Sequence, residues 1–297
     1  MDRLVEDGWN YHDSETERLA AELEAAAEAG VADIQLAPFL ALALHTIGEH
    51  LADWPRALEL SKRVLAGRQP DMNTARAWGR LYVAASLAGD ALLAAQSELL
   101  YLATAGDDFG AALLDMRFML AAALVGTKRS SEAARIFRGA LELVPQIHPS
   151  TMLDRTIAVA SNNLGWELYE TVGRGEDENA LLRLCGRTSL QYWLKCGNWI
   201  NEEKALYLNS LIANEAGNPR AALAHADLAI AVIETHGERP LDLALLHLAR
   251  ASSLASLGDL EGRSLAIESA DLAAAKLTAP DLQREFAAQR EKAISGF

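Results

Sequence analysis

The stretch that decides the fold is Ser131–Pro145, which reads SEAARIFRGALELVP. Ala133, Phe137 and Ala140 follow one another at spacings of four and three residues, so they share one face of a helix. Pro145 closes that helix, because proline has no backbone N–H and its ring clashes with the preceding turn. The stretch therefore predicts a helix with a narrow packing face that ends at a defined point.

The same layout recurs on both sides of this stretch. A first helix is predicted to begin after Ser14, where Ser14 and Glu17 form a capping-box pattern. The following helices are predicted as pairs over 36–51 and 55–67, 72–88 and 91–105, 108–125 and 131–145, 151–172 and 179–196, 201–216 and 220–236, and 240–257 and 260–276. A last, polar helix follows Pro280. These elements divide the chain into an acidic segment with a helix (1–35), a repeat array (36–277) and a capping helix (278–297).

Each second helix carries a small residue near its start, which allows the two helices of a pair to approach closely. These residues are Ala57, Ala94, Ala133, Ala180, Ala222 and Gly262. A glycine stands five residues before three of them, at Gly89, Gly175 and Gly217. We expect these glycines to end the first helices in a left-handed turn.

The pattern Ala-x3-Phe, then Ala, then a terminal Pro resembles the second helix of a tetratricopeptide repeat. Leu164-Gly165 followed by Leu168 is similar to the Leu-Gly-x2-Tyr pattern of the first helix, with Leu in place of Tyr. The small residues recur after 37, 39, 47, 42 and 40 residues, which is similar to divergent repeats in bacterial regulatory proteins. The resemblance implies an all-α, right-handed α-solenoid of about six stacked antiparallel hairpins. Armadillo or HEAT-like stacking, at about 40–47 residues per repeat, is the alternative that this period leaves open.

Composition agrees with an all-α chain and excludes some partners. Hydrophobic residues make up 51% of the 297 residues but aromatic residues only 6%, so the helix formers alanine and leucine supply the apolar content. The net charge of −14 argues against nucleic acid, whose phosphates require clustered Lys and Arg. Residues 1–35 hold ten acidic and two basic residues. This segment is interpreted as a solubilising outer face or, alternatively, as an acidic docking surface for a basic partner.

The cysteines and the hydropathy pattern point to the cytoplasm. Cys185 and Cys196 lie eleven residues apart in one predicted helix, which is about 16 Å and too far for a disulfide. Two free thiols suit a reducing compartment. The N-terminal sequence has neither the basic nor the apolar region of a secretory signal, and charged residues interrupt every apolar run before 18 residues. We therefore predict no membrane partner.

The resemblance also implies a binding groove lined by the first helices. Through the Leu164-Gly165 match, the inward-facing residues are Asn162, Trp166 and Tyr169, which share one helix face. An amide beside two aromatic rings suits a peptide ligand. Alternatively, Trp166 and Tyr169 pack against the next hairpin.

Alignment on the glycine turns and on this helix adds further groove residues. They are Lys204, Tyr207, Asn214, Arg76 and Arg155. This set is similar to the family's carboxylate-binding clamps, but the Lys/Asn spacing of those clamps is absent, and Trp166 stands where a clamp has Asn. A C-terminal carboxylate as ligand has only weak support.

A histidine-rich stretch, His45-Thr-Ile-Gly-Glu49-His50, invites comparison with metal motifs. The zinc signatures HExxH and HxxEH place both histidines on one face of a helix. In an α-helix, residues five apart diverge by about 140°. Ordinary polar residues are therefore expected here, with no metal site and no cofactor. The chain also has no GxGxxG, Walker, GxSxG or CxxC pattern.

Together these observations predict a non-enzymatic interaction module that binds a peptide or protein segment in its groove. The alternative is a sensor domain that binds a small molecule or a signalling peptide and changes its curvature. A second copy of the chain, giving a homodimer, is a further compatible partner. A helical enzyme is the least favoured interpretation.

Overall fold

The computed structural model describes residues 2–295, which form fifteen α-helices and no β-strand. The all-α solenoid class predicted from the sequence is confirmed. The chain divides into two compact units, an N-terminal unit (Met1–Thr156) and a C-terminal unit (Ile157–Phe297). Each unit is a stack of helical hairpins and is described by itself.

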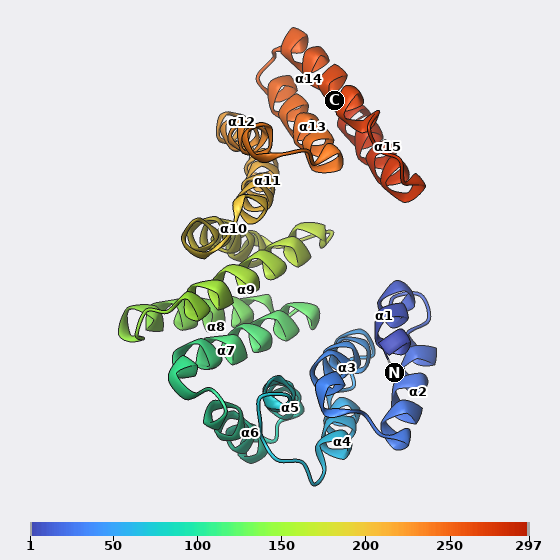
Figure 1. The fold of residues 1–297 in the computed structure, drawn as a ribbon, viewed down its shortest axis with the longest axis vertical. Coiled ribbons are helices and arrows are strands. Elements are labelled where there is room, and N and C mark those ends of the chain that lie inside the picture. The colour runs from blue at the N-terminus through green and yellow to red at the C-terminus, as the bar shows by residue number, and fades with distance from the viewer. Residues whose placement is uncertain (1, 296–297) are drawn as a thin grey trace. The chain divides into compact units, whose positions relative to one another are not determined.

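The N-terminal unit contains eight complete helices and four short helical segments in its described part. These are α1 (Asp2–Tyr11), α2 (Thr16–Ala29), the 3-10 turn η1 (Asp33–Gln35), α3 (Leu36–Ala43), the π-helix η2 (Leu44–His50), α4 (Trp54–Leu65), α5 (Ala75–Ala88), α6 (Ala91–Ala103), η3 (Gly106–Asp108), α7 (Phe109–Gly126), α8 (Ser130–Leu143) and η4 (Val144–Gln146). In Figure 1, α5 pairs with α6 and α7 pairs with α8 as hairpins.

The C-terminal unit is also built of helical hairpins. Helix α9 (Thr151–Glu170) crosses the boundary, and α10 (Glu176–Cys196), α11 (Trp199–Glu215), α12 (Pro219–His236), α13 (Pro240–Ser256), α14 (Leu260–Ala274) and α15 (Pro280–Ser295) follow. Helices α11 and α12 form one hairpin and α13 and α14 the next, with α15 against α13 (Figure 1). Arg290 of α15 donates two hydrogen bonds to Asp271 of α14, at 2.6 and 2.8 Å, which holds this last helix on the final hairpin.

The stretch that predicted the fold is helix α8 with the 3-10 turn η4. Ala133, Phe137 and Ala140 are all buried, and the Phe137 ring lies 4.9 Å from the ring of Phe118 on α7. The predicted packing face is confirmed: these residues hold the two helices of one hairpin together.

Helix starts and turns follow the predicted chemistry with some exceptions. Asp53 accepts a hydrogen bond from the backbone N–H of Arg56 at 3.0 Å and so begins α4, and equivalent caps begin α6, α12 and α14. Gly89 and Gly217 adopt the expected left-handed conformation, with φ of +84° and +69°. The prediction for Gly175 was wrong, because its φ is −81°.

The small residues near the starts of the second helices are buried in four of six cases. Ala57, Ala94, Ala133 and Ala222 are buried, whereas Ala180 and Gly262 are half-buried. At Gly262 an added Cβ would meet Asp259, the cap of its own helix, at 2.4 Å. Glycine at this position therefore leaves room for the Asp259 side chain that caps α14. The prediction that a small residue here allows close approach of the two helices does not hold.

The acidic N-terminal segment differs from the prediction. Helix α1 precedes the helix that was expected to be first, and Ser14 does not cap α2: its hydroxyl donates backwards to the Tyr11 carbonyl at 3.4 Å. Glu24 of α2 accepts two hydrogen bonds from Arg56 of α4, at 2.7 and 3.1 Å. Part of the acidic charge thus pairs with arginines of the first hairpin.

The predicted helix 36–51 changes its winding at Leu44. From Leu44 to His50 it is a π-helix, and the N–H of Leu51 donates to the Thr46 carbonyl, five residues back, at 3.1 Å. Inside this π-helix, Gly48 lies against the ring of Trp54, the first residue of α4. The assumption of α-helical spacing across this stretch was therefore wrong.

We expect Gly48→Ala to destabilise the N-terminal unit by about 1–3 kcal/mol, because a Cβ there would lie 2.6 Å from the buried Trp54 ring. Urea unfolding followed by circular dichroism measures this change. Gly139→Ala is the matched control, since a Cβ at Gly139 in α8 meets nothing within 4 Å. Alanine is favoured over glycine inside a helix, so this control should be neutral or slightly stabilising. Equal stability of the two variants would contradict the packing at Gly48.

One helical segment in the described part of the chain, Gly106–Gly126, is long and apolar enough to cross a membrane by length and composition alone. Most of it is buried inside the protein, as in the core helix of a soluble fold. The sequence analysis considered only apolar runs without charged residues. This segment qualifies because an 18-residue window of it is apolar on average although it contains two charged residues, Asp115 and Arg117.

Candidate functional site

Three of the predicted groove residues, Trp166, Tyr169 and Tyr207, meet in the C-terminal unit, on α9 and α11. Leu164 and Leu168 anchor α9 in the core. Gly165 lies against α11, where an added Cβ would be 2.9 Å from Leu208. The Leu-Gly pair therefore brings the two helices close together, and the side chains that follow it on α9 meet those of α11.

Trp166, Tyr169 and Tyr207 form an aromatic cluster. The Trp166 ring lies 5.9 Å from Tyr169 in an edge-to-face arrangement and 5.7 Å from Tyr207. All three side chains are half-buried. Tyr207 also packs against two apolar clusters, one formed by α13, α14 and α15 and the other by α11, α12 and α13. The rings of Trp166 and Tyr207 therefore pack together across α9 and α11, and all three side chains keep an exposed part.

Acidic side chains adjoin this aromatic cluster. Glu203 lies one turn before Tyr207 on α11 and is only 1% exposed. Its Oε1 is 3.6 Å from Nε of Arg239, which forms an ion pair with Asp242 at the start of α13. Burial, together with the nearby charge of Asp242, raises the pKa of Glu203 to about 8. Glu203 is therefore largely protonated at neutral pH.

The pKa values of two tyrosines in the cluster are raised as well. Burial raises the pKa of Tyr207, and Tyr169, Glu285 and Asp242 add to the increase. Burial, followed by Glu215, raises the pKa of Tyr169. Carboxylates therefore lie near both tyrosines, and the Arg174 guanidinium lies 6.0 Å from the centroid of the Tyr169 ring.

The other predicted groove residues have different surroundings. Lys204 is exposed on α11. Asn214 donates to the Ala249 carbonyl at 3.3 Å and accepts from Ser253 at 3.0 Å, so it joins α11 to α13. Asn162 accepts a long hydrogen bond of 3.4 Å from Ser189. Both amides thus already have partners inside the protein.

Two predicted residues belong to the N-terminal unit. Arg76 forms an ion pair with Asp115 of α7 at 3.1 Å. Arg155 is exposed on α9 before the boundary. Neither has a contact that ties it to the aromatic cluster among the described residues.

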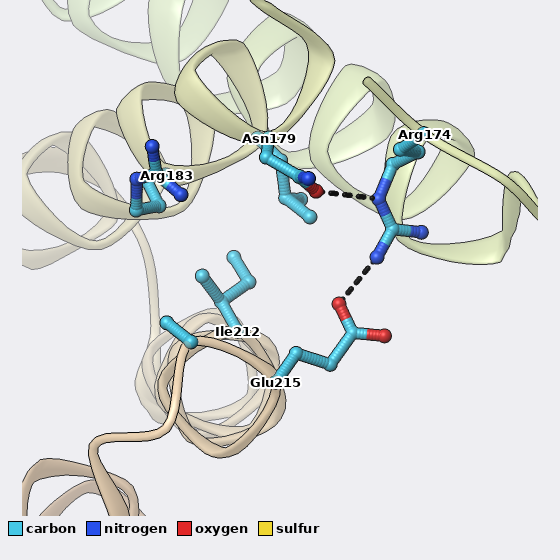
Figure 2. A pocket seen from close by; sticks show the side chains of 7 residues that line it. Arg174, Asn179, Arg183, Ile212 and Glu215 are labelled. Carbon is cyan, nitrogen blue, oxygen red and sulfur yellow. Dashed lines mark hydrogen bonds and ion pairs between the residues drawn. The ribbon is translucent and has the colours of Figure 1, made fainter. Parts of the chain in front are cut away.

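A cavity of about 330 Å³ opens elsewhere in the C-terminal unit, and Figure 2 shows its lining. Arg174 is the main polar residue of its lining. The Arg174 guanidinium donates hydrogen bonds of 2.6–2.8 Å to the carbonyls of Leu168, Tyr169 and Thr171, and so caps the C-terminal end of α9. It also bonds Asn179 at 3.1 Å and pairs with Glu215 of α11, as the dashed lines in Figure 2 show. Arg174 therefore joins three helices, and each of its three nitrogens already has a partner.

The histidine stretch is arranged differently from the sequence-based expectation. In the π-helix η2, His45 and His50 lie on the same side, with their Nε2 atoms 3.0 Å apart. His12, which follows α1, joins them, and one ring nitrogen of each histidine lies within 4.8 Å of the others. The divergence of 140° was wrong because it assumed 3.6 residues per turn.

The two cysteines are free, as predicted. Cys185 is fully buried, and burial raises the pKa of its thiol. A buried, protonated thiol is a poor nucleophile, so Cys185 serves packing between α9 and α10.

Comparison with known proteins adds little beyond the fold. No family model and no curated protein matches the chain. Among solved structures it is similar to one described as "Crystal structure of BtubC (BKLC) from P. vanneervenii", with 16% identity, a TM-score of 0.48, and coverage of 89% of this chain and 92% of that one. The class that the geometry itself defines is an all-α protein of stacked helical hairpins.

Proposed function

We propose that the protein is a divergent tetratricopeptide-like interaction module without enzymatic activity, whose C-terminal unit binds a protein segment with basic and apolar side chains. The observation that carries this proposal is the half-buried aromatic cluster of Trp166, Tyr169 and Tyr207 on two neighbouring first helices. Aromatic side chains that are rigid and partly exposed are the usual anchors of protein interfaces.

The charge beside the cluster supports a basic partner. Asp242 and Glu285 contribute negative charge around Tyr207. A Lys or Arg side chain of the partner would gain both a carboxylate and the face of an aromatic ring. The carboxylate-clamp interpretation has less support here, because Lys204 is the one predicted cation on α11 and the amide of Asn214 is already bonded.

The sensor interpretation has less support than peptide binding. The cavity at Arg174 is at the small end of the range for ligand pockets. Its main polar group is bonded to three carbonyls, an amide and a carboxylate, which leaves it little capacity for a ligand.

Trp166→Ala is expected to weaken binding of a selected peptide by about thirtyfold or more, as for a central aromatic anchor. The peptide would come from a displayed random library selected against the full chain, and calorimetry would give Kd for each variant. Trp199→Ala is the matched control, because Trp199 is a half-buried tryptophan of the same unit that begins α11 and stacks on His236 of α12.

Two results would count against the proposal. Unchanged Kd for Trp166→Ala would remove the aromatic cluster from the binding site. Selected peptides rich in acidic residues would contradict the basic partner, as would an Asp242→Asn variant with undiminished affinity for a basic peptide.

A further inference from the structure

We propose that His12, His45 and His50 bind a single first-row divalent cation, Zn²⁺ being the best fit, and that this ion fastens helix α1 to the first hairpin. The three side chains come from two separate elements, the turn after α1 and the π-helix η2. All belong to the N-terminal unit and are independent of the aromatic cluster.

The π-helix creates the site. Its backbone bonds reach five residues back, so His45 and His50 lie about one turn apart. Glu49, four residues after His45, remains beside it as well, with Oε2 at 2.6 Å from Nδ1. π-Helical turns are rare and occur frequently at functional sites. The change of winding thus brings His50 beside His45, whereas an α-helix would keep only Glu49 next to His45.

In His12 and His45 the hydrogen bonds are made by Nδ1, so Nε2 is the nitrogen that would bind a metal. Nδ1 of His45 contacts the Glu49 carboxylate at 2.6 Å, and Nδ1 of His12 contacts the Trp9 carbonyl at 2.8 Å. Both partners are acceptors, so each Nδ1 carries the proton and each Nε2 presents a lone pair. A carboxylate or carbonyl behind the imidazole is the usual outer support of a zinc-bound histidine.

The distances approach those of a tetrahedral centre. Zn–N bonds of about 2.0–2.1 Å in a tetrahedron place neighbouring ligand atoms about 3.3 Å apart. The Nε2 atoms of His45 and His50 are 3.0 Å apart, and Oδ1 of Asp13 lies 3.4 Å from His50 Nε2 and 3.5 Å from His12 Nε2. Small rotations of these side chains would bring all four atoms around one ion.

The donor set selects the type of ion. Three imidazoles and one carboxylate suit Zn²⁺ and its neighbours in the first transition row, whereas Mg²⁺ and Ca²⁺ prefer oxygen ligands. Asp13 is exposed and supplies the fourth ligand, which would close the site. A closed, tetrahedral site is typical of structural zinc. The ion would therefore hold α1 in place and would not take part in a reaction.

The packing around the site agrees with this role. Gly8 of α1 lies against Leu42 of α3, where an added Cβ would meet a methyl group at 2.7 Å. The Trp9 ring is 5.2 Å from the His45 ring. Helix α1 has only ten residues, and short helices depend on tertiary contacts for stability. A metal link would supply such a contact.

The test is metal titration of the full chain after removal of bound metal with a chelator. Calorimetry with Zn²⁺ should show one site per chain, and Co²⁺ should give the visible absorption of a tetrahedral centre. His50→Ala, at an exposed position, and His12→Ala should each weaken Zn²⁺ binding at least tenfold. His148→Ala is the matched control, since His148 is an exposed histidine of the same unit outside the cluster.

Further variants separate the roles of the two carboxylates. Asp13→Asn should lower Zn²⁺ affinity and change the Co²⁺ spectrum, because a ligand atom is altered. Glu49→Gln should lower the affinity about 10–100-fold and keep the tetrahedral spectrum, because Glu49 positions His45 without touching the ion. Zn²⁺ should also raise Tm of the native chain and of His148→Ala, and leave the Tm of His12→Ala/His50→Ala unchanged.

The proposal would be overturned if the native chain and the double variant His12→Ala/His50→Ala bound Zn²⁺ with equal affinity and stoichiometry. It would also be overturned if Co²⁺ gave the weak spectrum of an octahedral ion. Circular dichroism of each variant before titration confirms that the helices are intact, so that a loss of binding reports on the site.

Discussion

Replacement of Phe137 by alanine is expected to lower the free energy of unfolding of the N-terminal unit by about 3–5 kcal/mol. The side chain is fully buried and its ring packs on Phe118 across the α7–α8 hairpin. Removing it deletes a large apolar surface from the core and leaves a cavity that the two helices close only in part. Urea unfolding followed by circular dichroism gives the difference in free energy.

Phe109→Ala provides the matched control for this experiment. Phe109 is the first residue of α7 in the same hairpin and is 51% exposed, so its loss should cost well under half as much. Hydrogen exchange should show faster amide exchange in α7 and α8 for Phe137→Ala. If the two variants were equally stable, Phe137 would not be the centre of the hairpin core.

Glu203→Gln is expected to stabilise the C-terminal unit at neutral and alkaline pH. The folded protein holds the pKa of Glu203 at about 8, above the ordinary value of 4.5 for a glutamate. Between these two values the folded state binds a proton that the unfolded state has released, so stability falls as pH rises from about 4.5 to 8. Glutamine carries no titratable proton and removes this loss, which amounts to roughly 3–5 kcal/mol across the window.

The measurement is urea unfolding of both proteins at several pH values between 4.5 and 9. The native chain should lose stability toward high pH, and Glu203→Gln should lose less, so that the difference between them grows with pH. Glu202→Gln changes the adjacent, half-buried glutamate of α11 and should retain the native slope. Parallel curves for the native chain and Glu203→Gln would show that Glu203 is ionised in the folded protein.

The repeat pattern predicted most of the fold because each hairpin depends on local chemistry. The Asp53 cap, the Gly89 turn and the Ala133/Phe137 packing face all involve residues close together in the chain. Helix α1 was missed, since its apolar residues are few and its support comes from α3, more than thirty residues away. The π-helix was missed because the sequence interpretation assumed 3.6 residues per turn throughout this stretch.

The candidate site was predicted in part. Trp166 and Tyr169 share a helix face, which spacing alone reveals, and alignment on a glycine turn added Tyr207. Glu203 was not singled out, because one acid among the 41 of this chain carries no distinguishing signal in the sequence. Its raised pKa arises from burial and from Asp242 on another helix, and both require the folded structure.

The π-helix has a consequence for how the protein's relatives would differ. A π-helical turn holds one more residue than an α-helical turn, and one residue corresponds to about 100° of rotation along an α-helix. Deletion of a single codon between His45 and Glu49 would restore α-helical winding and place the two histidines four residues apart, a spacing that an α-helix keeps on one face. The histidine pair would then survive in a relative that lacks the extra residue. A spacing of five in a π-helix and a spacing of four in an α-helix are therefore the equivalent patterns to compare among relatives.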